Sequence, residues 1–325
     1  MNKQPLEEDV EGAANALIPR LGFGTAHLMG RIGSRESTRL VHAALDAGIS
    51  HFDTARVYGL GDTEQMLGRA LQKRKGVTIY TKVGLGSSRH SRFKALLHSA
   101  VRPLAAARAR LDGGATAFPV PPGLSGRNPD FTVGHVRTSV ETSLKMLRRD
   151  AIDGLLLHEA SVEDVRPELL ELLETLVREG KVRRYGVASG HASLVRFQSY
   201  DLPGDILQQA GGPFLEPISP EGNFQIILHS LFGAKGHDLK PFLSWLNESP
   251  RERDQLKDVL VAERMEEIPI LLFSYTATKW PHATVVFAST TPKHIHANAS
   301  TMANPLQNDS VVTVANCLHR YKNQV

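Results

Sequence analysis

The stretch Gly48-Ile-Ser-His-Phe-Asp53 is a short apolar run that ends in a carboxylate. Two further runs end in polar groups: Val77-Thr-Ile-Tyr-Thr-Lys82 in an ammonium group, and Ile152-Asp-Gly-Leu-Leu-Leu-His158 in an imidazole. Tyr58 lies in the short segment that follows the first run. Because parallel strands of one sheet all end on the same side, side chains at their C-terminal ends share one mouth. The pattern therefore predicts a parallel sheet with a carboxylate, a phenol, an ammonium group and an imidazole at that mouth.

Similar β-branched runs alternate with helical patterns from about residue 18 onward. Their apolar stretches are nearly continuous, as expected for parallel strands that are covered on both faces. The expected strands are Ile18–Gly22, Gly48–Asp53, Val77–Thr81, Ile152–Leu157, Arg184–Ala188, Asp205–Leu207, Asn223–Leu228 and Thr284–Phe287. The expected helices are Ser37–Ala47, Asp62–Gln72, Thr132–Arg148, Val162–Glu179, Pro250–Thr278 with an interruption at Pro269, Pro292–Ala299 and Ser310–Lys322. This alternation favours an α/β fold of the (β/α)₈ TIM-barrel type over an open sheet.

Two long segments do not fit the alternation. Residues 87–130 form an insertion after the third strand, and its second part, from Gly113 to Pro129, is rich in Gly and Pro. The loop Gly211–Pro220 is a shorter segment of the same kind. Connections of such length are usually functional or mobile, so both are expected at the C-terminal face of the barrel. The first part of the insertion is basic, with Arg89, Arg92, Lys94, Arg102, Arg108 and Arg110.

We therefore expect one domain, a barrel over residues 18–308, with an N-terminal extension at 1–17 and a C-terminal helix at 309–325. The chain has 325 residues, 41% of them hydrophobic and 22% charged, so it can bury a sizeable core. A net charge of +4 is only mildly basic and gives little support for a nucleic-acid partner.

The sequence also bears on compartment and redox chemistry. No apolar run is long enough to span a membrane, and the first residues lack the apolar region of a secretory signal. A cytoplasmic protein is therefore expected. The one cysteine, Cys317, excludes an intrachain disulfide, and its apolar neighbours favour a buried, inert thiol.

The four polar groups at the expected mouth form a proton-donating set. A phenol, with an ordinary pKa of about 10, is a poor acid at neutral pH. The ammonium group of Lys82 is therefore expected to lower the pKa of Tyr58, while Asp53 holds Lys82 charged and in place. His158 can donate a hydrogen bond to a carbonyl oxygen, so the set can protonate an oxygen while hydride arrives at carbon.

Each of the four residues also has a simpler interpretation. Asp53 can cap the segment that follows it, and Tyr58 can pack on the rim of the barrel. Lys82 can be a solvated strand end, and His158 a rim histidine without a chemical role. Four compatible groups at strands of the same polarity favour the joint, functional interpretation.

The segment Gly48–Gly59, followed by Thr63–Leu71, resembles the signature of the aldo-keto reductase family. Further segments that resemble motifs of this family are Thr81–Gly84, Ser143–His158 and Gly180–Ser189, so the similarity runs from about Leu21 to Asn298. In the segments Gly22–Leu28 and His229–Gly233, the chain resembles bacterial members of the sugar-dehydrogenase type more than mammalian aldose reductases.

This resemblance implies a (β/α)₈ barrel that binds a nicotinamide cofactor in an extended form, without a Rossmann domain. It also implies roles for the four polar residues. Tyr58 would be the general acid/base, Lys82 and Asp53 would tune it, and His158 would orient the substrate.

The same resemblance marks residues that would contact the nicotinamide. Ser189, together with Gln208 or Gln209, matches residues that bind the carboxamide, whereas Gly190 stands where the family usually has an asparagine. His229 stands where a tyrosine usually stacks on the nicotinamide, so its flat imidazole would stack instead. Further contacts are expected from Gly24, Thr25, Ser230 and Leu231.

At the adenosine end, the segment Ser289–Asn298 resembles the family pattern with one important change. His294 replaces an arginine, whose planar fork suits a 2′-phosphate better than a neutral imidazole does. Lys293 and the N-terminus of a helix beginning at Pro292 would compensate. NADP(H) is therefore favoured, with NAD(H) as the alternative cofactor. The residues expected at this end are Ser289, Thr290, Lys293, His294 and Asn298.

These features predict an NAD(P)(H)-dependent oxidoreductase that transfers hydride between nicotinamide and a carbonyl or alcohol carbon of a small aldehyde, ketone or sugar. No metal site is expected, because His294 and His296 point apart on a helix. One alternative is a nicotinamide-binding regulatory or redox-sensing barrel with little turnover. Another is a structural barrel with decayed chemistry, which the changes at Gly190, His229 and His294 suggest. The sequence leaves open the substrate, the direction, the oligomeric state and the role of the insertion 87–130.

Overall fold

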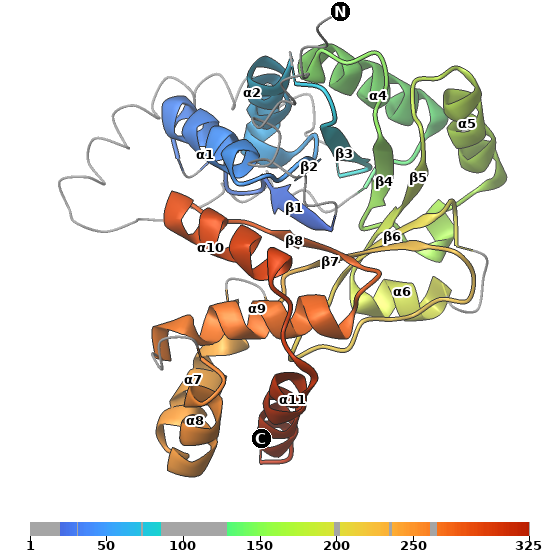
Figure 1. Ribbon diagram of the computed structural model, residues 1–325. Coiled ribbons are helices and arrows are strands. Elements are labelled where there is room, and N and C mark those ends of the chain that lie inside the picture. Colours follow the sequence, from blue (N-terminus) through green and yellow to red (C-terminus); the bar gives the residue numbers. More distant parts are fainter. Residues whose placement is uncertain are drawn as a thin grey trace, which may run out of the picture.

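A closed parallel β-barrel forms the centre of the protein in a computed structural model, as predicted (Figure 1). The structure describes residues 20–30, 32–72, 74–85, 129–197, 202–233, 236–260 and 265–324. Each strand pairs in parallel with the next one along the chain, and the last strand pairs with the first to close the barrel. The strands are β1 (Leu21–Gly24), β2 (His51–Asp53), β3 (Thr78–Val83), β4 (Gly154–His158), β5 (Tyr185–Ala188), β6 (Ile206–Ala210), β7 (Gln225–His229) and β8 (Thr284–Phe287).

Apolar side chains from both faces of the strands are buried, which explains the nearly continuous apolar runs in the sequence. One set fills the barrel interior, including Tyr80, Leu156 and Ile227. The opposite face packs under the surrounding helices, where Phe23 and Phe52 are fully buried. The helices around the barrel are α1 (Ser34–Asp46), α2 (Asp62–Leu71), α4 (Val133–Leu147), α5 (Pro167–Arg178), α6 (His191–Phe197), α9 (Ile268–Lys279) and α10 (Pro292–Ala303).

A second apolar core lies outside the barrel, between α9 and three helices that extend away from it in Figure 1. These helices are α7 (Leu239–Asn247), α8 (Pro250–Lys257) and α11 (Asn308–Lys322). The rings of Phe242 and Tyr321, 5.2 Å apart between centroids, connect α7 with α11. Cys317 is fully buried in this core, and burial raises the pKa of its thiol to about 12. The prediction of a buried cysteine is therefore confirmed, and the raised pKa disfavours the thiolate, which is the reactive form.

Several element boundaries differ from the prediction. The expected helix Pro250–Thr278 is wrong, because α8 ends at Lys257 and α9 begins only at Ile268. Proline is well accommodated in the first turn of a helix, so Pro269 marks the start of α9 rather than a kink within one helix. Likewise, the expected helix Val162–Glu179 is a 3₁₀ turn at Val162–Asp164 followed by α5, which begins at Pro167.

Other predictions concern parts of the chain that the structure does not describe. The N-terminal extension at 1–17 and nearly all of the insertion at 87–130 lie outside the described residues.

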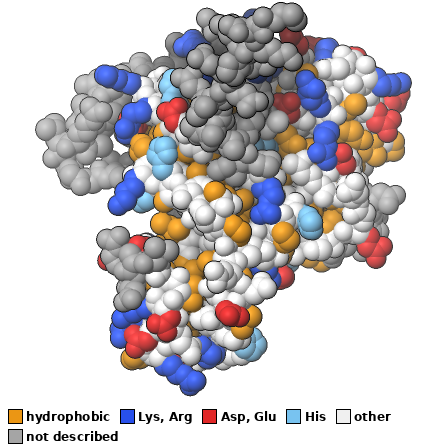
Figure 2. Space-filling model, in the orientation of Figure 1, with side chains coloured by type: hydrophobic (Ala, Val, Ile, Leu, Met, Phe, Trp, Pro, Cys, Tyr) orange, Lys and Arg blue, Asp and Glu red, His pale blue; other side chains and the backbone are white. Residues whose placement is uncertain are grey.

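The helices α6 and α7 were not predicted from the sequence. Within the described residues, no helix has the length and apolar character that crossing a bilayer requires. The face in Figure 2 carries Lys and Arg together with Asp and Glu in small mixed groups.

Candidate active site

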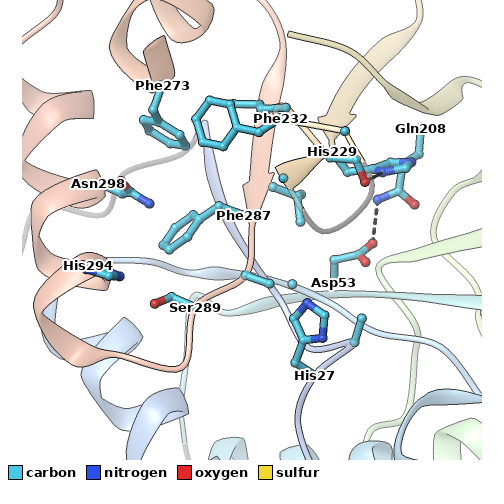
Figure 3. A pocket seen from close by; sticks show the side chains of 18 of the residues that line it. His27, Asp53, Gln208, His229, Phe232, Phe273, Phe287, Ser289, His294 and Asn298 are labelled. Carbon is cyan, nitrogen blue, oxygen red and sulfur yellow. Dashed lines mark hydrogen bonds between the residues drawn. The ribbon is translucent and has the colours of Figure 1, made fainter. Parts of the chain in front are cut away.

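A cavity of about 750 Å³ opens at the C-terminal end of the barrel strands (Figure 3). Residues at the ends of β2, β3 and β4 reach it, as the sequence pattern predicts: Asp53, Lys82 and His158. Tyr58 also lines the cavity, from the 3₁₀ turn η2 (Tyr58–Gly61) that follows β2. The structure therefore brings all four predicted residues to one site.

Asp53 and Lys82 form a buried ion pair at the base of the cavity. The Lys82 ammonium donates to Asp53 Oδ1 at 2.5 Å and to the Thr54 carbonyl oxygen at 3.0 Å. Burial alone would lower the pKa of Lys82, but the effects that raise this pKa outweigh burial, and the negative charge of Asp53 is the largest of them. Lys82 is therefore a fixed cation at neutral pH.

Tyr58 lies beside this cation and against the ring of His158. The Lys82 Nζ is 5.4 Å from the centroid of the Tyr58 ring, and the Tyr58 and His158 rings meet edge to face at 6.2 Å. Burial raises the pKa of Tyr58 above its ordinary value, while the positive charge of Lys82 opposes this rise. Lys82 therefore acts on this pKa in the predicted direction, but the prediction that the pKa of Tyr58 falls below its ordinary value is wrong, because desolvation of the phenolate is the larger effect. Tyr58 is a protonated phenol at neutral pH.

Two histidines of the cavity wall are neutral at physiological pH. Burial, with the nearby charge of Lys82, lowers the pKa of His158 to about 3. Burial likewise lowers the pKa of His229 to about 4. A neutral imidazole offers one N–H donor and one acceptor, so His158 can donate a hydrogen bond without adding charge.

The turn that carries Tyr58 is fixed from two sides. Arg56, in the same loop, donates to the fully buried carboxylate of Glu64 on α2 at 2.5 Å. The same carboxylate also accepts hydrogen bonds from Thr81 on β3, at 2.7 Å, and Ser143 on α4, at 2.8 Å. Gly59, directly after Tyr58, has φ +56°, and a Cβ there would lie 2.5 Å from Thr63 Oγ1. Only glycine fits this conformation and space without strain.

Gln208, on β6, connects the ion pair with the cavity. Its Nε2 donates to Asp53 Oδ2 at 2.9 Å, a contact drawn in Figure 3. Its Oε1 is buried and has no hydrogen-bond partner among the described residues. A buried acceptor without a partner is costly, so this oxygen is an open position for a donor that enters the cavity.

Of the other residues predicted to contact the nicotinamide, some line the cavity and some do not. Those that line the cavity are Gly24, His229, Ser230 and Leu231. Thr25 and Ser189 are buried beside it, and their hydroxyls donate to carbonyl oxygens, Thr25 to Asp53 at 2.9 Å and Ser189 to Ala160 at 2.8 Å. Neither hydroxyl hydrogen is left for a ligand in this arrangement, although each oxygen can still accept a bond.

At the predicted adenosine end, Ser289, His294 and Asn298 line the cavity, whereas Thr290 and Lys293 do not. The helix α10 begins at Pro292, as predicted, but Pro292 has no N–H, and the His294 N–H already donates to the Thr291 carbonyl oxygen at 3.0 Å. The Lys293 N–H is therefore the donor that the first turn of α10 can offer to an anion. Among the described residues that line the cavity, Lys82 is the one Lys or Arg, and it is paired with Asp53.

Several cavity residues were not predicted. The aromatic side chains of Phe232, Phe273 and Phe287 line one side (Figure 3), and His27 and Glu159 also belong to the wall. Glu159 directly follows His158, so the rule that polar residues at strand ends face the mouth could have found it. Phe273 lies on α9, whose position no local pattern predicts. Within the described residues, no group of His, Cys, Asp and Glu is placed to hold a metal ion.

Comparisons of the sequence with family models and with known proteins point to the same family. The model of the aldo/keto reductase family matches residues 20–200. A D-threo-aldose 1-dehydrogenase of a Pseudomonas species is 33% identical over 190 residues, which cover 56% of this chain and 53% of that protein. An NADP(+) aldo-keto reductase of Schizosaccharomyces pombe is 27% identical over 215 residues, which cover 64% of this chain and 53% of that protein. The chain thus spans about half the length of these relatives.

Solved structures show the same fold over nearly the whole chain. The glycerol dehydrogenase of Gluconobacter oxydans superposes with a TM-score of 0.66 at 19% identity, covering 93% of this chain and 92% of that one. An aldo-keto reductase of Klebsiella pneumoniae in complex with NADPH gives a TM-score of 0.59 at 16% identity, covering 93% and 94%. The family match includes β1 to β5, with Asp53, Tyr58, Lys82 and His158. This chain belongs to the aldo/keto reductase family.

Proposed function

We propose that the protein is a nicotinamide-dependent oxidoreductase that interconverts a carbonyl group and an alcohol on a small substrate. The single observation that carries this proposal is the buried Asp53–Lys82 pair, with the Tyr58 phenol and the His158 imidazole in one cavity. These four groups supply a neutral proton donor, a fixed positive charge and a hydrogen-bond donor, which is what reduction of a carbonyl group requires.

A bound nicotinamide would supply the hydride in reduction and accept it in oxidation. In reduction, the Tyr58 hydroxyl would donate its proton to the substrate oxygen, and the charge of Lys82 would stabilise the phenolate that remains. Neutral His158 would donate a hydrogen bond to the same oxygen and so fix the orientation of the carbonyl group. In oxidation, the proton would return to the phenolate.

The unpartnered Oε1 of Gln208 supports a nicotinamide in this cavity, because a carboxamide NH₂ group is the donor that this acceptor lacks. The exposed imidazole of His294 and the Lys293 N–H at the start of α10 can donate hydrogen bonds to the adenosine phosphates. One relative is named for NADP(+) and one solved structure contains NADPH. We therefore propose NADP(H) as the preferred cofactor, with NAD(H) as the alternative.

For the substrate we propose a small aldehyde, ketone or sugar. The name D-threo-aldose 1-dehydrogenase of one relative supports the sugar class. The aromatic side of the cavity, with Phe232, Phe273 and Phe287, can exclude water from the reacting atoms.

The proposal is tested by mixing the purified protein with NADPH and a panel of aldehydes, ketones and aldoses, and following the loss of NADPH absorbance. Aldoses are also tested in the reverse direction with NADP⁺. We expect multiple turnovers on at least one substrate. Saturable NADPH binding without turnover on the panel would support a redox-sensing barrel instead. Absence of binding by both NADPH and NADH would contradict the proposal altogether.

A further inference from the structure

Glu159 places a carboxylate at the cavity wall next to the proposed proton donor. It directly follows His158 and lines the same cavity as Tyr58. Its backbone has φ +57°, a conformation that side-chain-bearing residues adopt uncommonly. Its N–H donates to the Ala188 carbonyl oxygen at 2.7 Å, so the end of β5 holds this residue in place. Unusual backbone conformations of this kind often occur at ligand sites.

The Glu159 side chain is directed by a second contact. Its Oε2 accepts a hydrogen bond from the Gly190 N–H at 3.2 Å. A Cβ at position 190 would lie 3.6 Å from the same oxygen, so the glycine leaves the space in front of this carboxylate open. A longer side chain at 190 would extend into that space.

The charge of Glu159 is not neutralised within the described part of the cavity. Asp53 is paired with Lys82, and both His158 and His229 are neutral. No Lys or Arg among the described residues forms an ion pair with Glu159. Burial is the main cause that raises the pKa of Tyr58, and the negative charge of Glu159 acts in the same direction. Glu159 and Tyr58 therefore place a carboxylate and the proposed proton donor on the wall of one cavity.

We propose that Glu159 selects the substrate: it accepts hydrogen bonds from hydroxyl groups near the reacting carbonyl and repels substrates that carry a carboxylate there. The preferred class is therefore an uncharged, polyhydroxylated aldehyde or aldose. A carboxylate has two oxygens and can accept bonds from two neighbouring hydroxyl groups at once. A negatively charged substrate would face a like charge on the wall of the same cavity that no described Lys or Arg pairs with, which disfavours its binding and its transition state.

This inference rests on the proposed function, and two matched substrate pairs test it. Glyceraldehyde and propionaldehyde have the same carbon chain with and without hydroxyl groups. Succinic semialdehyde and butyraldehyde have the same carbon chain with and without a carboxylate. The value of kcat/KM with NADPH is measured for all four in the wild-type protein and in Glu159→Gln, which keeps an acceptor for the Gly190 N–H.

In the wild-type protein we expect glyceraldehyde to be preferred over propionaldehyde, and butyraldehyde over succinic semialdehyde. Glu159→Gln should raise kcat/KM for succinic semialdehyde about tenfold, because it removes one like charge from the wall of the proposed substrate cavity. It should lower the preference for glyceraldehyde several-fold. The effect on the charged substrate should shrink at high salt, whereas the effect on glyceraldehyde should not.

The matched control is Glu163→Gln, which removes the same charge from an exposed residue that pairs with Arg196 outside the cavity. This variant should leave all four values unchanged. Equal substrate ratios in wild type and Glu159→Gln, with normal turnover, would overturn the inference about Glu159.

A binding measurement separates this inference from the proposed function. Calorimetric titration of D-glucose and D-glucuronate into the NADP⁺-loaded protein compares an uncharged sugar with its carboxylate. We expect wild type to prefer glucose and Glu159→Gln to lose that preference. If no aldehyde is turned over but this difference is seen, the hydride-transfer proposal fails and the charge selection stands. Equal affinities of both sugars for the wild-type protein would count against Glu159.

Discussion

At the scale of single residues, the site depends on a balance between burial and charge around one phenol. Burial disfavours the phenolate of Tyr58, and the neighbouring cation of Lys82 favours it. The two effects do not cancel, so Tyr58 stays protonated in the free protein. The sequence places both residues at one mouth correctly, but it contains no measure of how far the ring is removed from water. The direction of the pKa shift was therefore wrongly predicted.

Replacing Tyr58 by phenylalanine removes the proposed proton donor and keeps the ring that packs against His158. We expect kcat for carbonyl reduction to fall by about two to four orders of magnitude, the usual contribution of a positioned acid. NADPH affinity, measured by quenching of protein fluorescence, should change little. Tyr185→Phe, at a partly buried tyrosine outside the cavity, is the control and should retain activity. Turnover in Tyr58→Phe close to the wild-type rate would refute the assigned role.

At the scale of helices and strands, the sequence predicts the barrel well and its connections poorly. Strand β8 has the predicted bounds, and the predicted end of β2 at Asp53 is confirmed. Buried parallel strands are recognisable because a local apolar run suffices to identify them. The helices α6 and α7 were missed because they are short and draw much of their stability from packing against other elements. The packing of α2 against α4 could not be predicted either, because no local sequence pattern shows which helices are neighbours in the fold.

Gly68 allows α2 and α4 to pack closely. A Cβ at this position would lie 2.2 Å from the Met146 carbonyl oxygen, so alanine would force the two helices apart. We expect Gly68→Ala to lower the free energy of unfolding by about 2 kcal/mol, although alanine is the better helix former. Gly134→Ala is the matched control, because its Cβ on α4 would meet nothing within 4 Å. That variant should be neutral or stabilising by up to about 1 kcal/mol in urea unfolding. Equal effects of the two substitutions would show that helix contact is not the cause.

At the scale of the whole molecule, the barrel holds neutral histidines at both of its ends, partly buried at the mouth and buried at the other end. His158 and His229 lie at the C-terminal mouth, with pKa values lowered by burial to about 3 and about 4. His51 begins β2 at the opposite end, where burial lowers its pKa to about 4. Its ring packs against Tyr80 at 4.6 Å between centroids, and its Nε2 has no hydrogen-bond partner among the described residues. Such groups connect the stability of the entire fold to pH.

The sign of this dependence follows from the lowered pKa values. Above the ordinary histidine pKa of 6.5, folded and unfolded chains are both neutral at these positions, and the full stability is present. As the pH falls from 6.5 toward about 4, the unfolded chain binds protons that the folded chain does not, so stability is lost. For His51 alone the loss is roughly 3 kcal/mol at about pH 4.

Urea unfolding at several pH values between about 7.5 and 4.5 tests this dependence. We expect the free energy of unfolding to fall by roughly 1.4 kcal/mol per pH unit for each histidine that titrates only in the unfolded chain. His51→Gln should reduce this slope by roughly 1.4 kcal/mol per pH unit, the contribution of one histidine, even if it also lowers the free energy of unfolding at every pH. His282→Gln, at an exposed histidine, controls for the loss of any imidazole. This variant should leave the pH dependence of the free energy of unfolding unchanged. A slope in His51→Gln equal to that of the wild type would mean that His51 binds its proton equally well in the folded and the unfolded chain, so that its pKa is not lowered by the barrel. The buried, uncharged ring assigned to this end of the fold would then be wrong.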